Sequence, residues 1–310
     1  MSESTLSAKQ QISSIWDIGG LTWPELFRRT WGGINQNDLI NRAYELAYNF
    51  LLAVFPLLIF LLAVLGSFAT ASYGLRAYLF FYFQRALPPA AYGVLFTTLR
   101  EISQDAGGGK LTFGLLFALY TGSGGMTQLI STLNAAYEVH EARSWVRVHL
   151  ISLGLTIALS MLSAAALLLV FASGLVLAPI SQAIGPTPAS LLAGRVLQWT
   201  LALGFVVIAF ALIYYFAPDV KERHWYWITP GSVVGVFAWA IASAALRGYL
   251  RFFDTYSKTY GSLGAVVILM LWFYVTGLAF LVGGQINSTI EHAAAEHGHP
   301  EAKAVGQKVA

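Results

Sequence analysis

The chain has 310 residues, of which 57% are hydrophobic and only 11% are charged, and it contains no cysteine. Soluble domains carry roughly a quarter charged residues, so this composition favours one polytopic membrane domain over two soluble domains. The lack of cysteine excludes disulfides, cysteine metal sites and thiol chemistry. The net charge of +3 is small for a nucleic-acid-binding protein, which needs a clustered basic surface.

Residues 1–37 are predicted to form a cytoplasmic tail that ends in an interfacial helix. Residues 12–37 place Trp23, Phe27 and Trp31 among acidic and arginine side chains. Aromatic residues mixed with arginine are typical of an amphipathic helix that lies in the membrane interface. A packed soluble helix is the alternative, but the composition leaves little soluble domain to receive it.

The first transmembrane helix is predicted to start near Asp38 and to continue to about Gly66. Arg42, Glu45 and Asn49 follow one another at helical spacing, so they share one face of this helix. An ionisable residue inside a membrane helix is by default a functional-site hypothesis. The alternative is that Arg42 and Glu45 lie at headgroup level and only pair with each other.

The second transmembrane helix is predicted over about residues 111–137, after a long connection at 70–110 that is expected to hold amphipathic surface helices. Small and polar side chains, among them Thr121, Gln128 and Asn134, cover a large part of this helix. Such a surface is too polar to face lipid. It indicates either a central packing helix or the lining of a hydrated cavity, and the sequence leaves these alternatives equal.

Three further apolar segments are predicted to span the membrane, in the first part of 148–194, at about 190–216 and at about 229–250. If the third of these helices continues past residue 250, charged residues at its end recur at helical spacing and form a candidate rim for headgroups or substrate: Arg247, Arg251, Asp254 and Lys258. The alternative, which the sequence favours, is that arginines at a helix end extend to the membrane surface.

The sixth helix is the clearest, because residues 259–290 contain no Asp, Glu, Lys or Arg. A helix needs about 20 apolar residues to cross a bilayer, and this stretch is long enough. Spacings of three and four place small side chains on one face, where another helix can approach closely. This face is formed by Tyr274, Gly277, Leu281, Gly284 and Ser288.

Together these segments predict an all-α fold, a polytopic membrane bundle of six transmembrane helices over residues 38–290 with interfacial amphipathic helices and a disordered cytoplasmic tail at 291–310. The polar side chains of a candidate pathway are Arg42, Glu45, Asn49, Thr121, Gln128, Asn134, Gln285 and Asn287. The prolines and glycines expected to shape the helices are Pro56, Pro218, Pro230, Gly231, Gly261, Gly277, Gly283 and Gly284.

Five separated segments carry a resemblance to a known family: AYNFLLAVFPLLIFLLAVLG at 47–66, LNAAYEV at 133–139, YYFAPD at 214–219, TPGSVVG at 229–235 and YGSLGAVVILMLWFYVTGLAFLVGGQIN at 260–287. On these segments the chain resembles the YihY/BrkB family of bacterial inner-membrane proteins, once misnamed ribonuclease BN. The family's usual serine in the first segment is Ala53 here. The resemblance implies six transmembrane helices with both termini cytoplasmic. It implies transport only by analogy, since some members have been linked to lipid A precursor export.

The sequence predicts neither an enzyme nor a cofactor or metal site, because no histidine has a helix-spaced histidine or carboxylate partner inside a predicted span. We interpret the chain as a multi-pass inner-membrane transporter or flippase-like protein for a lipid or small molecule. The alternative is a non-transporting scaffold for envelope integrity. The expected partners are membrane lipids, with a homo-oligomer left open, and no nucleic acid. The ribonuclease interpretation is rejected, because neither a carboxylate or histidine cluster nor a basic RNA surface is visible.

Overall fold

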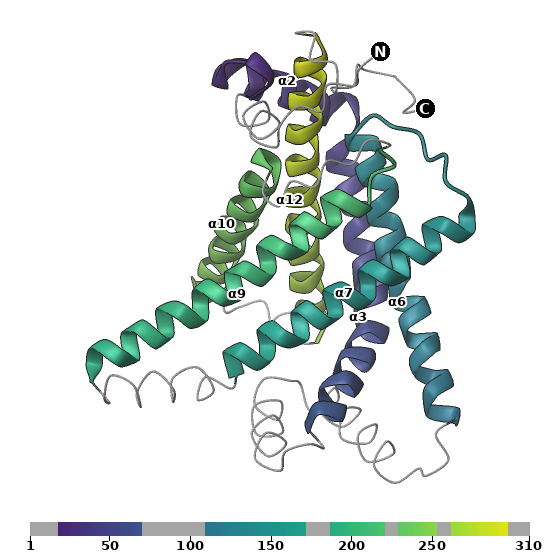
Figure 1. The fold of residues 1–310 in the computed structure, drawn as a ribbon, viewed down its shortest axis with the longest axis vertical. Coiled ribbons are helices and arrows are strands. Elements are labelled where there is room, and N and C mark those ends of the chain that lie inside the picture. The colour runs from purple at the N-terminus through teal and green to yellow at the C-terminus, as the bar shows by residue number, and fades with distance from the viewer. Residues whose placement is uncertain (1–17, 70–108, 172–186, 221–228, 253–261, 297–310) are drawn as a thin grey trace, which may run out of the picture. The chain divides into compact units, whose positions relative to one another are not determined.

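The computed structural model describes residues 18–69, 109–171, 187–220, 229–252 and 262–296, and all regular secondary structure in these ranges is helical (Figure 1). The elements are η1 (Ile18–Gly20), α2 (Trp23–Gln36), α3 (Leu39–Ala69), α6 (Gly109–Ala136), α7 (Trp145–Phe171), α9 (Pro188–Phe216), α10 (Pro230–Phe252) and α12 (Ser262–Glu296). The predicted all-α class is therefore confirmed for the described part of the chain.

Several predictions lie outside these ranges. They include the surface helices of the 70–110 connection as far as residue 108, the rim residues Asp254 and Lys258, Gly261, and the tails at residues 1–17 and 297–310. The side chain of Arg251, at the end of α10, is likewise not described.

Four helices in the described part of the chain are long and apolar enough to cross a membrane. The segments are Trp145–Ala166, Pro188–Phe216, Pro230–Tyr249 and Val266–Glu296. The first two predicted spans coincide with α3 and α6, which are not among these four, so the total of six transmembrane helices stays a prediction. Pro56 lies inside α3, where the expected kink also stays a prediction.

The chain divides into two compact units, and α3, α6, α7 and α9 contribute residues to both. The first unit contains the chain up to Leu52, Gly124–Ser152 and the chain from Phe210 onward. The second contains Ala53–Ser123 and Leu153–Ala209. Inside the second unit, the side-chain amide of Gln198 on α9 donates to the carbonyl oxygen of Leu169 on α7 at 3.0 Å.

α12 is the central helix of the first unit, because it packs against α10, α2 and η1 and also faces α3 and α6. Its face of small residues is buried from Gly277 onward, and Leu281 is 0% exposed. A Cβ atom added at Gly277 would lie 3.2 Å from Leu46 of α3, and one added at Gly284 would lie 2.9 Å from Leu133 of α6. The spacing of three and four residues thus directs this face toward α3 and α6.

A second face of α12 meets α10 and the end of α9 through glycine. α10 lies beside α12 (Figure 1), and a Cβ atom added at Gly231 or Gly283 would overlap the other glycine's carbonyl oxygen. The buried Tyr214 of α9 donates its hydroxyl to the carbonyl oxygen of Phe280 at 2.9 Å. Side chains at these two glycines would hold the helices apart, so glycine is needed for this close approach.

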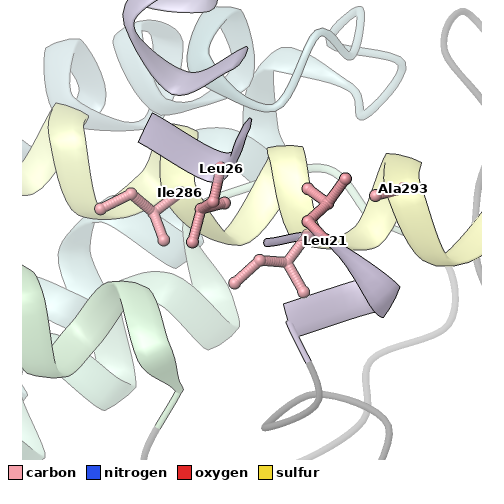
Figure 2. Close-up of a cluster of buried hydrophobic side chains, with 5 residues drawn as sticks. Leu21, Leu26, Ile286 and Ala293 are labelled. Carbon is pink, nitrogen blue, oxygen red and sulfur yellow. The ribbon is translucent and has the colours of Figure 1, made fainter. Parts of the chain in front are cut away.

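The C-terminal part of α12 is covered by η1 and α2, and this corrects one predicted boundary. The contact is a cluster of apolar side chains (Figure 2): Leu21, Leu26, Ile286, Ile290 and Ala293. α12 continues to Glu296, so residues 291–296 are helical rather than part of a disordered tail. The physical reason is that apolar side chains beyond residue 290, such as Ala293, are still buried.

We expect Gly231→Ala to destabilise the protein by roughly 1–3 kcal/mol, the usual cost of overpacking. The added methyl group would meet both the backbone carbonyl oxygen of Gly283 and the side chain of Asn287 on α12. The matched control is Gly248→Ala in the same helix, where nothing lies within 4 Å of the added carbon. The control should be neutral or stabilising by up to about 1 kcal/mol, because alanine favours helix more than glycine does. Equal thermal unfolding midpoints of the two variants in mild detergent would contradict the close approach.

Candidate functional site

Polar side chains gather in the first unit where α2, α6 and α9 end and where α7 and α10 begin. We call this group the polar layer. Its members are Asn37, Asn134, Glu138, Glu141, Arg143, Asp219, Gln285 and Asn287. Helix ends leave backbone donors and acceptors without helical partners, so polar side chains are needed at such a place in an apolar bundle.

Arg143 is the most buried charge of the polar layer, with 3% of its side chain exposed. Its guanidinium donates to both carboxylate oxygens of Glu141 at 2.7 Å, and its Nε atom lies 3.5 Å from Asp219. It also donates to the carbonyl oxygens of Phe216 and Ala217 at 3.3 and 2.8 Å. The arginine therefore neutralises two carboxylates and satisfies carbonyl groups at the C-terminal end of α9.

The pKa of Glu141 is set by two opposing effects. Burial alone would raise the pKa of this carboxyl group, because it disfavours the charged form. The hydrogen bonds and charge of Arg143, together with the amide of Asn134, favour the carboxylate and lower the pKa below its ordinary value of 4.5. Glu141 is thus held as an anion at neutral pH.

Asn134 connects α6 both to the loop that follows it, through Glu141, and to the segment that follows α9, through Asp219. Its side-chain carbonyl accepts the backbone N–H of Asp219 at 2.8 Å, and its amide donates to Glu141 at 2.8 Å. The residue is 4% exposed, so both polar ends of its side chain are used inside the fold. One amide thereby fixes the segment that follows α9 against α6.

Asn37 and Gln285 join α2, the end of α6 and α12. The side-chain amide of Asn37 donates to Gln285 and to Glu138, each at 3.1 Å. The backbone carbonyl of Asn37 accepts from Nε of Arg42 at 3.0 Å. A side chain at Gly33 would overlap the amide of Gln285, so α2 can reach this amide only because residue 33 is glycine.

Asn287 joins α12 to the start of α10 by a side-chain hydrogen bond, as Gln285 joins α12 to the end of α2. Its side-chain oxygen accepts the backbone N–H of Gly231, in the first turn of α10, at 2.9 Å. Its amide group donates to the hydroxyl of Tyr137 at 3.2 Å. A free backbone donor of a helix N-terminus is therefore satisfied by a side chain of the central helix.

A second polar group lies on α3, after its first turn, and on α6, before its last two turns. The amide of Gln128 donates to the carboxylate of Glu45 at 3.1 Å, and the amide of Asn49 donates to the backbone carbonyl of Glu45 at 2.8 Å. Thr127 donates to Ser152 of α7 at 2.9 Å. We call Glu45, Asn49 and Gln128 the α3–α6 polar group.

The predicted pathway residues are therefore distributed over two groups rather than one. Glu45, Asn49 and Gln128 belong to the α3–α6 polar group, while Asn134, Gln285 and Asn287 belong to the polar layer, with Arg42 bonded to it through Asn37. Thr121 belongs to the second unit and donates to the carbonyl of Phe117 in its own helix at 2.9 Å.

The sequence left open the alternative that Arg42 and Glu45 of α3 lie at the level of the lipid headgroups and only pair with each other. Arg42 instead bonds to a backbone carbonyl, and Glu45 bonds to Gln128 of another helix. Of the candidate rim, Arg247 is exposed on α10.

Sequence reasoning missed Asn37, Glu138, Glu141, Arg143 and Asp219. Two signals could have found some of them. Glu138 and Asp219 stand in the segments LNAAYEV and YYFAPD, next to residues already selected. Glu141 and Arg143 lie in a short loop between two apolar helices, where a charge that is close to both helix ends can be buried.

Among the described residues, no three histidine, aspartate or glutamate side chains are gathered as a metal-ligand set. The carboxylates of the polar layer bond to side chains of the protein itself. Glu141 and Asp219 pair with Arg143, and Glu138 accepts from Asn37.

Apolar helices of membrane-spanning length, joined at their ends by buried polar contacts, define a helical membrane protein. Residues 30–307 match the family described as Virulence factor BrkB. The chain therefore belongs to this family, which confirms the resemblance found in the sequence.

Named relatives agree with this membership. The Putative ribonuclease-like protein YfkH of Bacillus subtilis (strain 168) is 32% identical over 250 residues, covering 81% of this chain and 89% of the relative. A UPF0761 membrane protein of Xanthomonas oryzae pv. oryzae (strain PXO99A) is 29% identical over 286 residues, covering 89% of this chain and 62% of the relative. The chain thus spans less than two thirds of the length of that Xanthomonas protein. No solved structure matches the chain.

We expect Arg143→Met to be strongly destabilising, by about 3–5 kcal/mol, because it leaves two carboxylates without their buried cation. The matched control is Arg147→Met, which removes an exposed arginine from the first turn of α7 and should change stability by less than about 0.5 kcal/mol. Thermal unfolding in detergent measures both variants. Similar unfolding midpoints would show that Arg143 is not a buried charge.

The lowered pKa of Glu141 predicts a pH dependence of stability. A carboxyl group whose pKa is lower in the folded than in the unfolded state contributes stability above its unfolded pKa, near 4.5. This contribution is lost as the pH falls through the lowered folded pKa. We therefore expect the difference in unfolding midpoint between the native protein and Glu141→Gln to shrink below pH 4.5. A difference that stays constant from neutral pH into this acidic range would contradict the bonding of Glu141 to Arg143.

Proposed function

We propose that the protein is a transporter or flippase-like protein of the inner membrane that moves a lipid or another small molecule with a polar group. The observation that supports this most is the hydrogen bond between Glu45 and Gln128 at 3.1 Å. Glu45 is exposed, and the large side chains around it on α3, such as Tyr48 and Leu52, are exposed and mainly apolar. An ionisable residue among membrane helices marks a substrate or ion path by default.

The chemistry of the α3–α6 polar group suits a polar substrate. Glu45 supplies a hydrogen-bond acceptor and a negative charge, while the Gln128 amide supplies donors and an acceptor. A phosphate-bearing or hydroxyl-bearing headgroup offers the complementary groups. Glu45 lies six residues after the start of α3, about 9 Å along the helix at 1.5 Å per residue, which places it inward from the polar layer.

A non-transporting scaffold is the second candidate, and the polar layer favours it. Each amide of the layer bonds to another part of the protein, as interhelical contacts in a static bundle would. The ribonuclease-like name of the Bacillus subtilis relative suggests a third activity, but we propose that this chain is not a nuclease. The carboxylates of the layer are occupied by Arg143 and Asn37. RNA cleavage by the pure protein that a Glu45→Gln variant loses would refute this part.

We also propose that the polar layer faces the cytoplasm, with both termini on that side. The loop that joins α6 to α7 carries Arg143, and the first turn of α7 carries Arg147. Short loops rich in Lys and Arg are retained on the cytoplasmic side.

Single cysteines distinguish transport from scaffolding, since the parent chain has none. We expect Gln128→Cys to react with a membrane-impermeant maleimide from both sides of the membrane, because a transport route must be reached from each. Ala142→Cys, at an exposed loop position between Glu141 and Arg143 of the polar layer, should react from the cytoplasmic side only. The matched control for Gln128→Cys is Leu133→Cys, also on α6, which should not react because residue 133 is 0% exposed.

Two outcomes would count against the proposals. If Gln128→Cys reacts from neither side, or only from the side that labels Ala142→Cys, the route is contradicted and the scaffold is favoured. If Ala142→Cys reacts only from the periplasmic side, the proposed orientation is wrong.

A further inference from the structure

α2 presents three different flanks, and the first is fixed by its contact with α12. The helix runs across the C-terminal part of α12 (Figure 1). Its buried side chains follow helical spacing and face α12: Leu26, Thr30, Gly33 and Ile34. Figure 2 shows Leu26 beside Ile286 of α12.

The second flank is charged and faces the C-terminal end of α12. Arg29 donates to Glu296, the last residue of α12, at 2.7 Å and to Glu25 in its own helix at 3.1 Å. At about 100° per residue, Glu25 lies about 100° around the helix axis from Leu26, on one side of the buried face. This side of α2 therefore points toward the end of α12 and away from the charge-free part of that helix, residues 262–290.

The third flank is aromatic and lies on the other side of the buried face. Trp23, Phe27 and Trp31 follow at intervals of four residues, and they are 69%, 72% and 54% exposed. Phe27 lies about 100° from Leu26 in the direction opposite to Glu25. Because the charged flank faces the end of α12, the aromatic flank faces back along α12 toward its apolar segment.

We propose that this aromatic flank is a docking surface for the bilayer, inserted in the interfacial region beside α12, with Arg28 bound to the phosphate of an anionic phospholipid headgroup. Tryptophan and phenylalanine on one flank, with charges on the opposite one, match the two sides of a membrane surface. Arg28 adjoins Phe27, its side chain is 80% exposed, and its distance to Glu25 is 3.8 Å, so it is accessible to a phosphate. α2 then sets the depth at which α12 and the polar layer lie. This inference does not depend on transport.

The test uses the full chain in vesicles of phosphatidylcholine with phosphatidylglycerol, with one nitroxide label on a single cysteine. The aromatic flank is labelled through Phe27→Cys or, should that variant fold poorly, Trp31→Cys. The matched control is Gly32→Cys, an exposed position on the charged side of α2 where an added side chain meets nothing within 4 Å. We expect the ratio of collisions with oxygen to collisions with a water-soluble nickel complex to be higher at position 27 or 31 than at position 32.

The headgroup contact is tested by adding Arg28→Gln to the labelled Phe27→Cys protein. We expect a loss of oxygen exposure at the label in vesicles with phosphatidylglycerol, and no loss in vesicles of phosphatidylcholine alone. Equal exposure to the nickel complex at positions 27 and 32 would overturn the docking surface. Spin–spin broadening at position 27 would also overturn it, because a second copy of the chain would then cover the flank. Loss of oxygen exposure in neither lipid would overturn the role of Arg28.

Discussion

A buried amide or carboxylate in an apolar bundle is destabilising until it finds a hydrogen-bonding partner, and this constraint organises the first unit. Gln285 and Asn287 are two residues apart on α12 and therefore lie on different sides of this helix, and each finds its partner on a different segment. Gln285 accepts from Asn37 after α2, and Asn287 accepts from Gly231 at the start of α10. The position of α12 is thereby fixed relative to α2 and α10.

Packing and hydrogen bonding in this unit depend on each other. Short amide side chains reach across helices only when backbones are close, and glycine permits that approach. Gly33 admits the amide of Gln285, and the contact of Gly231 with Gly283 brings a backbone N–H of α10 to Asn287. A larger side chain at either position would therefore cost a hydrogen bond in addition to the packing.

The helical class, the presence of a helix at Trp23–Gln36 and the burial of the small-residue face of α12 could be predicted from the sequence, because hydrophobic length and periodicity are local properties. The hydrogen-bonding partners of the buried polar side chains could not be predicted from the sequence. Asn134 was selected as a polar residue on a helix, but its bonds to Asp219 and Glu141 join residues far apart along the chain or across a loop. Arg143 stands in a short loop, and the sequence does not show that Asp219 and the carbonyl oxygens at the end of α9 surround it, so that only 3% of its side chain is exposed.

The central claim is that amides of α12 hold separate segments of the chain together, and a double-mutant cycle between Asn37 and Gln285 tests it most directly. The free energy of unfolding is measured for Asn37→Ala, Gln285→Ala and the double variant. The account predicts that the single losses do not add, with a coupling of about 0.6 kcal/mol or more, as for other hydrogen bonds between membrane helices. Losses that add within error would contradict the account, because the two amides would then act independently.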